Sequence, residues 1–160
     1  MFYFLSTEYV EYFSYLNLFN YITFRAGAAI LTSLFFSLIF GELIIKKLSS
    51  FQPLGQPIRA DGPENHIIEK AGTPTMGGVL ILSSMIISLF FWANLSNNFI
   101  WICLMSSLMF GLIGFVDDFQ KVKFNNHKGV SGRVRLVLQI ICSFFTVLMI
   151  YNSIPDNINS

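Results

Sequence analysis

Long stretches without charged residues alternate with short polar segments along this chain. Residues 26–45 carry one charge, Glu42, and residues 71–116 and 136–155 carry none. The polar run 94–98 divides the longest of these stretches into two parts. A helix of about 20 apolar residues crosses the hydrocarbon layer of a bilayer, about 30 Å. The pattern therefore predicts four transmembrane helices, over about residues 24–46, 74–93, 99–117 and 134–152.

Aromatic residues crowd the segment that precedes the first predicted span. Met1–Tyr21 contains nine Phe and Tyr residues together with Glu8 and Glu11, and the first basic residue is Arg25. A signal peptide would have a positively charged start and a small-residue cleavage site, which this segment lacks. Aromatic rings favour the headgroup level of a membrane, so we predict an N-terminal interfacial segment.

Composition excludes the other broad classes of protein. Residues of the hydrophobic class make up 54% of the 160 residues, and charged residues only 12%. A soluble domain of this size needs about twice that charged fraction, and a disordered chain is poor in aromatic residues. We therefore expect an all-α integral membrane protein, with the lipid bilayer as its solvent and no nucleic acid as a partner.

The placement of basic residues predicts the orientation in the membrane. Nine of the ten basic residues fall between the first and second spans or between the third and fourth. Loops rich in Lys and Arg stay in the cytoplasm. We therefore place loops of about residues 47–73 and 118–133 in the cytoplasm and both termini outside, as in a multi-pass membrane protein.

The first cytoplasmic loop ends in a pattern that suggests an anion site. Thr73 followed by Pro74 is typical of a helix start, with a hydroxyl N-cap and proline at the first helical position. Helix N-termini attract anions, and Lys70, Thr73 and Thr75 would add one charge and two hydroxyls there. The alternative is an ordinary capped helix whose neighbouring glycines pack against another helix.

Two adjacent carboxylates, Asp117 and Asp118, end the third predicted span at its cytoplasmic side. The negative end of the helix dipole disfavours acidic side chains there, and two like charges side by side add to the cost. A bound Mg²⁺ would offset this cost, since carboxylates are among its usual ligands. An ion pair of Asp117 with Lys121, four residues on, is an alternative, and solvated carboxylates beyond the membrane edge are another.

A basic stretch follows the acid pair and leads into the fourth span. Gly129 and Gly132 predict a turn, and Lys128, Arg133 and Arg135 flank it. Such residues commonly anchor a helix on its cytoplasmic side. They could instead form a basic wall that binds an anionic lipid headgroup or a diphosphate.

Together these motifs resemble the bacterial phospho-N-acetylmuramoyl-pentapeptide transferases. The matching residues of the first cytoplasmic loop are Arg59, Asp61-Gly62-Pro63, His66, Lys70 and Gly72-Thr73-Pro74-Thr75-Met76-Gly77-Gly78. Those around the acid pair are Gly114-Phe115-Val116-Asp117-Asp118, Lys121-Val122 and Lys128-Gly129. The resemblance covers nearly the whole chain, and Thr75-Met76 favours the muramoyl branch of the superfamily.

The resemblance implies a reaction and a set of partners. Such enzymes transfer phospho-MurNAc-pentapeptide from UDP-MurNAc-pentapeptide to undecaprenyl phosphate, and the products are lipid I and UMP. The reaction requires Mg²⁺ and is the first membrane step of peptidoglycan synthesis, on which cell shape and cell division depend. Another polyprenyl-phosphate sugar-1-phosphate transferase is the alternative within the same class of enzymes.

The resemblance also assigns roles to residues. Asp117, Asp118 and Lys70 are the expected catalytic residues, with Asp117 receiving or orienting a proton of the lipid phosphate and Asp118 placing Mg²⁺ or substrate. We expect both acids to be metal ligands. Lys70 would neutralise charge between two anions. The expected substrate-binding residues are Thr73, Thr75, Lys121, Lys128 and Arg133.

Length is where the chain departs from this family, whose members are about twice as long. The resemblance implies that the main metal ligand, a third aspartate, lies in a missing C-terminal half. We therefore expect this chain to be an N-terminal portion that is inactive alone, unless a homodimer completes the site. A non-catalytic four-helix membrane protein is the alternative from another class. Ion passage is disfavoured, because it needs charges near mid-span and the middle of each span is uncharged.

Overall fold

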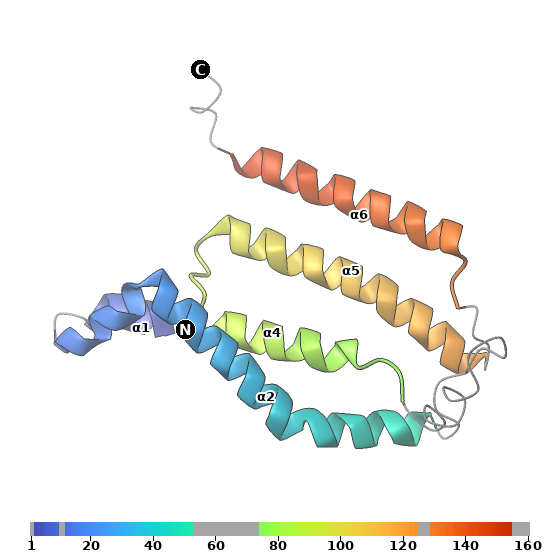
Figure 1. The fold of residues 1–160 in the computed structure, drawn as a ribbon. Coiled ribbons are helices and arrows are strands. Elements are labelled where there is room, and N and C mark those ends of the chain that lie inside the picture. Colours follow the sequence, from blue (N-terminus) through green and yellow to red (C-terminus); the bar gives the residue numbers. More distant parts are fainter. Residues whose placement is uncertain (1, 10–11, 53–73, 125–128, 155–160) are drawn as a thin grey trace.

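The computed structural model describes residues 2–9, 12–52, 74–124 and 129–154, and every regular element within these ranges is a helix. Figure 1 shows the helices as a layer in chain order, connected alternately at its two ends. The elements are α1 (Phe2–Tyr9), the 3-10 helix η1 (Ser14–Asn20), α2 (Ile22–Phe51), α4 (Gly78–Trp92), α5 (Asn98–Lys123) and α6 (Gly132–Ser153).

Three of these helices are long and apolar enough to cross a membrane. Helices α2, α5 and α6 have 30, 26 and 22 residues, which corresponds to about 45, 39 and 33 Å. Helix α4 is apolar but has 15 residues, or about 22 Å. The predicted class, an all-helical membrane protein, is thereby confirmed, with three candidate spans and a shorter apolar helix.

The predicted start of the second span is wrong. Helix α4 begins at Gly78, its N-cap is Gly77 without a side-chain cap, and Pro74 lies outside the helix. The physical reason is the backbone of Met76, whose φ of 72° belongs to the left-handed region. A helix cannot pass through such a residue, so Pro74 and Thr75 remain outside the helix, in front of α4.

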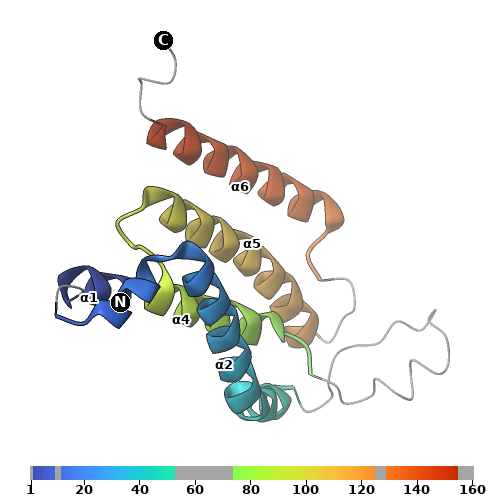
Figure 2. The same cartoon turned by 60° about the vertical axis from the view of Figure 1, so that its left-hand side comes forward.

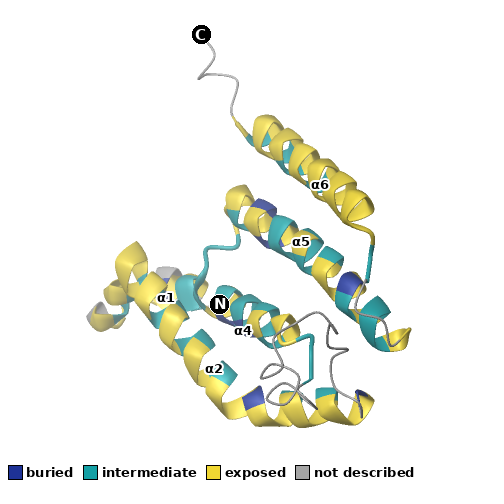
Figure 3. Ribbon diagram, turned by 45° about the vertical axis from the view of Figure 1, so that its right-hand side comes forward, coloured by how far each residue is buried: buried dark blue, intermediate teal, exposed yellow. Residues whose placement is uncertain are grey.

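Very few apolar side chains are buried within this layer of helices. Ile102 and Leu104 are the buried hydrophobic residues in the described part of the chain. Helix α6 has no buried residue and packs on α5 alone among the described elements. Figure 2 shows α6 along the outer side of α5, and Figure 3 shows most of its surface as exposed. Apolar helices exposed on most sides are typical of proteins surrounded by lipid or by further helices.

An aromatic cluster fastens the N-terminal segment to the bundle. The ring of Phe2 lies 4.8 Å from that of Trp92 on α4, and the ring of Phe19 lies 5.8 Å from it. The indole nitrogen of Trp92 also donates a hydrogen bond of 2.9 Å to Thr32 Oγ1 on α2. Helices α1, η1, α2 and α4 thus meet around Trp92. Figure 1 shows α1 at the end of the layer opposite the C-terminal end of α5, where the Asp117–Asp118 pair lies. The interfacial position of this segment remains a prediction.

Helices α4 and α5 approach closely at Gly111. A Cβ atom at this position would collide with the Leu82 side chain of α4. A Cβ atom on Gly114, about one turn further along α5, would meet no atom within 4 Å. Small residues at such contacts allow helices in a membrane to pack with good van der Waals contact.

We therefore expect Gly111→Ala to displace the Leu82 side chain into another rotamer, at a cost of about 0.5–1.5 kcal/mol. The control is Gly114→Ala, because both variants share the gain in helix propensity of up to about 1 kcal/mol. Thermal denaturation of both variants in the same detergent is the measurement. Equal midpoints for the two variants would contradict the close contact.

Candidate functional site

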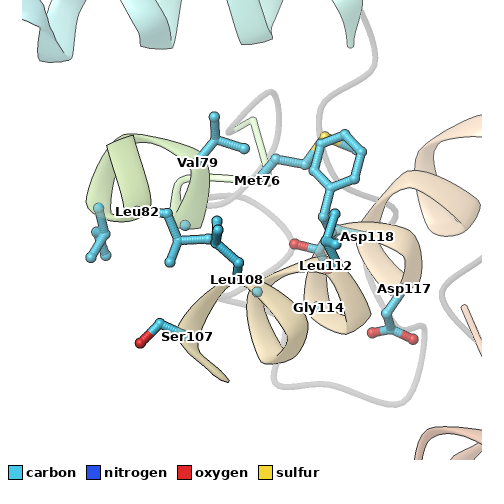
Figure 4. A pocket seen from close by; sticks show the side chains of 13 residues that line it. Met76, Val79, Leu82, Ser107, Leu108, Leu112, Gly114, Asp117 and Asp118 are labelled. Atoms are coloured by element: carbon cyan, nitrogen blue, oxygen red, sulfur yellow. The ribbon is translucent and has the colours of Figure 1, made fainter. Parts of the chain in front are cut away.

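The two adjacent acids of α5 occupy very different environments. Helix α5 continues past them to Lys123, so they lie in its last two turns and not at its end. Asp117 is 5% exposed, whereas the Asp118 side chain is 30% exposed. Figure 4 shows the Asp117 carboxylate directed away from Met76 and Val79 of the α4 region. The alternative of two solvated carboxylates is therefore wrong for Asp117.

Both carboxylate oxygens of Asp117 have partners from the chain. Oδ1 accepts a hydrogen bond of 2.9 Å from the backbone N–H of Val130. Oδ2 lies 2.6 Å from Lys121 Nζ and 3.5 Å from Arg135 Nη1. A buried carboxylate requires such compensation, because removal of its charge from water is costly. Of the alternatives that the sequence left open for Asp117, the ion pair with Lys121 is the one that the structure contains.

Lys121 connects the two acids. Its ammonium group also lies 3.1 Å from Asp118 Oδ1, so one lysine pairs with both carboxylates. The other oxygen of Asp118 accepts a hydrogen bond of 2.8 Å from Thr75 Oγ1. This bond joins the segment in front of α4 to the acid pair on α5, two regions that sequence analysis had selected separately.

Thr75 is also tied to the end of α2. Its backbone N–H donates to Gln52 Oε1 at 2.9 Å, and its carbonyl accepts from Gln52 Nε2 at 3.4 Å. The Gln52 residue is 4% exposed and directly follows α2. These contacts engage both backbone groups of Thr75 outside a helix, which is consistent with the start of α4 at Gly78. Sequence reasoning missed Gln52, since nothing in its local pattern distinguishes it from an ordinary loop residue.

The turn that leads into α6 packs directly on Asp117. Gly129 has a φ of 54°, which confirms a turn here. A Cβ on Gly129 would lie 2.6 Å from Asp117 Oδ1 and 2.8 Å from Lys121 Cε. Helix α6 then begins after Ser131, whose hydroxyl oxygen is the N-cap acceptor for the Val134 N–H at 3.5 Å.

A cavity of about 600 Å³ extends from the acid pair between α4 and α5. Its lining is mostly apolar and includes small residues, so it offers a slot beside Asp118 rather than a polar pocket (Figure 4). The lining residues are Met76, Gly78, Val79, Ile81, Leu82, Ser107, Leu108, Gly111, Leu112, Gly114, Phe115, Asp117 and Asp118.

The structure brings together some of the expected site residues and separates others. Thr75, Lys121 and the two acids form one hydrogen-bonded group. Arg133 is exposed on the first turn of α6 and forms no ion pair with the residues that the structure describes. Arg135, for which the sequence left open either anchoring of the helix or a basic wall, contacts Asp117. Lys70, Thr73 and Lys128 lie outside the described residues.

The acid pair by itself does not fit an Mg²⁺ site. Each of its four carboxylate oxygens already has a donor from the chain: Val130, Lys121 or Thr75. An ammonium group between the two acids also occupies the place that a cation would take. The described part of the chain contains no group of three or more Asp, Glu, His or Cys residues that could hold a metal ion.

The fold and the site together define a class of protein. The chain is a multi-pass helical membrane protein in which an apolar bundle carries one compact cluster of acids, a lysine and an arginine. Comparisons with known proteins specify this class further. A family model described as phospho-N-acetylmuramoyl-pentapeptide-transferase signature 1 matches residues 70–82.

Two relatives extend this match well beyond the signature. A phospho-N-acetylmuramoyl-pentapeptide-transferase of Granulibacter bethesdensis is 45% identical over all 160 residues, which correspond to 44% of its own length. One from Dinoroseobacter shibae is 57% identical over 122 residues, or 76% of this chain and 34% of the relative. The chain therefore belongs to the phospho-N-acetylmuramoyl-pentapeptide transferase family, as its motifs indicated, and spans less than half the length of these relatives.

We predict that Thr75→Val weakens the connection between the signature segment and the acid pair. Loss of the hydroxyl removes a hydrogen bond to a half-buried carboxylate, worth about 1 kcal/mol. Thr75→Ser keeps the donor and should behave like the parent. The measurement is the midpoint of thermal denaturation in detergent.

Thr146→Val on α6 is the matched control, because its hydroxyl donates to the Cys142 carbonyl far from this site. A Thr75→Val midpoint equal to that of Thr146→Val would contradict a specific role for the bond to Asp118.

Proposed function

We propose that this chain forms the first part of an enzyme that transfers phospho-MurNAc-pentapeptide from UDP-MurNAc-pentapeptide to undecaprenyl phosphate, with lipid I and UMP as products. The observation that carries the proposal is the contact between two motifs. Thr75, within the matched signature, donates its hydroxyl to Asp118 on α5. A purely local resemblance would not require these segments to meet.

The chemistry fits a site at the edge of a membrane. The acceptor phosphate is a monoester with a second pKa near 6, so it is largely dianionic at neutral pH and needs little proton removal. The larger barrier is to bring two anionic phosphates together in line. In the proposed reaction an oxygen of the lipid phosphate attacks the β-phosphorus of the UDP-sugar, the P–O bond to UMP breaks, and UMP leaves with the electron pair.

Positive side chains would reduce this repulsion. We propose Lys70 as the charge that meets the phosphates, with Thr73, Lys128 and Arg133 as further substrate-binding residues around it. Thr75 and Lys121 belong to the same site, but their polar atoms are held by Asp118 and the acid pair. Thr75 and Lys121 would therefore hold the acids of the site in position.

Mg²⁺ is proposed as the cofactor because the family resemblance implies it. Since the oxygens of Asp117 and Asp118 are occupied by donors of the chain, the metal would need its main ligand elsewhere in the full-length enzyme. We propose that the remaining part of the relatives' length supplies this ligand and the uridine pocket. A homodimer that completes the site is the alternative.

The proposed topology has four spans, with α4 as the short second one. Both termini lie outside, and the acid pair faces the cytoplasm of a bacterial inner membrane. The support is the charge pattern, together with the alternating connections of the helices in Figure 1. Helices α1 and η1 lie at the end of the bundle opposite the acid pair, as an outer interfacial segment would.

To test the transfer reaction, we would join residues 1–160 to the remaining part of the Granulibacter bethesdensis relative. With UDP-MurNAc-pentapeptide, undecaprenyl phosphate and Mg²⁺, this chimera should release UMP and form lipid I. Residues 1–160 alone should not. Lys70→Ala should lower turnover about 100-fold or more, and Lys70→Arg should restore little, since arginine differs in reach and geometry.

Lys46→Ala is the control, because Lys46 is an exposed lysine of α2 paired with Glu42. Turnover with another UDP-sugar in place of the muramoyl substrate would indicate a different transferase of the same class. An inactive chimera that inserts and folds normally would count against the proposed reaction.

The topology is tested by fusion of a reporter that is active only outside the cytoplasm. Fusions after Asn97 or Ser160 should give signal, whereas fusions after Gly62 or Lys128 should not, because the loops rich in basic residues stay inside. Signal from either of the latter two would overturn the four-span arrangement.

A further inference from the structure

We propose that a cavity beside Arg25, at the end of the bundle where α4 connects to α5, binds the phosphate group of an anionic phospholipid. The cavity has a volume of about 400 Å³ and is lined by the start of α2, the end of α4 and the start of α5. Figure 1 shows these three helix ends on the same side of the layer. In the topology proposed above this side faces outward, so the ligand would be a lipid of the outer leaflet.

Arg25 carries a charge that the described residues around it do not compensate. It is the one basic residue outside the two loops rich in Lys and Arg, and it lies in the first turn of α2, where the helix dipole disfavours a cation. Its Nε atom is buried and has no hydrogen-bond partner among the residues that the structure describes. Buried polar atoms of this kind are rare in proteins. Because arginine keeps its charge in proteins, an anion is the expected complement.

The contact of Arg25 with Tyr3 orients the guanidinium group but does not satisfy it. The guanidinium carbon lies 4.5 Å from the centre of the Tyr3 ring. A cation–π contact uses the face of the guanidinium plane, whereas the N–H donors point outward from its edge. A phosphate oxygen is a ligand that matches such donors. Tyr3 therefore holds the arginine in place without taking the role of a hydrogen-bond acceptor.

Two asparagines add further donors to the polar side of the cavity. Asn94 Oδ1 accepts a hydrogen bond of 3.1 Å from the Ser96 backbone N–H, and Asn97 Oδ1 accepts one of 3.0 Å from the Phe99 backbone N–H. Each amide thus uses its oxygen locally and keeps an NH2 group, which can only donate. No acidic residue is among the described residues that line the cavity. A lining with one cation and amide donors is complementary to an anion.

The rest of the lining is apolar and favours a lipid over a free phosphate ion. Ile22, Met85, Leu89 and Ile100 contribute apolar side chains to the cavity, and Trp92 lines it as well. Tryptophan is enriched at the headgroup level of membranes. The phosphate of a lipid could meet Arg25 there while its acyl chain lies against the apolar side chains. The combination of one charge and an apolar wall therefore assigns the cavity to a phospholipid headgroup.

Quenching by brominated lipids tests this site without any catalytic activity. Trp101→Phe makes Trp92 the single tryptophan of the chain. Residues 1–160 with this change are placed in mixtures of phosphatidylglycerol and phosphatidylcholine, in which one of the two lipids carries bromine on its chains. Bromine quenches a tryptophan that it contacts, so the quenching gives the relative binding constant of the two lipids beside Trp92. Phosphatidylglycerol should bind about 10-fold more tightly, as expected for one hydrogen-bonded charge pair.

Substitutions of Arg25 identify the charge that selects the lipid. Arg25→Gln should reduce the relative binding constant to about 1, and Arg25→Lys should retain only part of the preference, because lysine lacks the planar set of donors. Lys47→Gln is the matched control, since it removes an exposed positive charge near the other end of the same helix. A preference that persists in Arg25→Gln, or that Lys47→Gln abolishes equally, would overturn the proposal.

Thermal denaturation separates lipid binding from a structural role of Arg25. If Arg25 serves only to pack on Tyr3, Arg25→Gln should lower the midpoint equally in phosphatidylglycerol and in phosphatidylcholine, and this result would overturn the proposal. If Arg25 binds the phosphate, phosphatidylglycerol should raise the midpoint of the parent and not that of Arg25→Gln. Inorganic phosphate is the third arm. A shift as large as that from phosphatidylglycerol would identify a soluble anion and overturn the assignment to a lipid.

The same midpoints are measured in the chimera with the Granulibacter bethesdensis relative, because further helices could cover this cavity. A shift by phosphatidylglycerol that Arg25→Gln removes from the chimera would support the lipid site in the longer protein. A shift confined to residues 1–160 would assign the cavity to a contact with those helices and overturn the proposal. The reporter fusions decide the membrane orientation separately, so a failure of lipid binding and a failure of the proposed topology are distinguishable.

Discussion

The burial of one carboxylate determines how the described part of this protein is arranged around its site. Asp117 is almost inaccessible within a bundle of apolar helices, where an uncompensated charge would be very costly. Lys121, Arg135 and the Val130 N–H supply the compensation. Because these groups come from α5, α6 and the turn between them, the requirement of a single side chain fixes the relation of two helices.

A second connection brings the signature segment to the same place. Gln52 at the end of α2 holds both backbone groups of Thr75, and the Thr75 hydroxyl contacts Asp118. This arrangement keeps Pro74–Gly77 out of the helix and shortens α4 at its start. Through Lys121, which pairs with both acids, the contacts of Asp118 and those of Asp117 form one network. Networks of this kind hold a site more rigidly than isolated pairs do.

The remaining surface of the bundle is apolar and largely uncovered. Helix α6 contributes no buried residue, and Ile102 and Leu104 of α5 are the buried hydrophobic side chains of the described ranges. Since the chain spans less than half the length of its relatives, lipid and the proposed remainder of the enzyme would share these surfaces.

The sequence by itself determined the class of the protein, the apolar segments, the family and the selection of Asp117, Asp118, Thr75 and Lys121. These features depend on local composition, on spacing along a helix and on short motifs, which are visible in one dimension. Only the tertiary structure decided that Asp117 is buried while the Asp118 side chain is 30% exposed. It also decided that Val130 and Arg135 are partners of Asp117 and that Gln52 is a partner of Thr75. The hydrogen bonds of Thr75 to Gln52 and to Asp118 join residues far apart in sequence, so no local pattern encodes them. The environment of a charge is set by whatever the fold brings against it, and that is why two adjacent and identical residues have different surroundings.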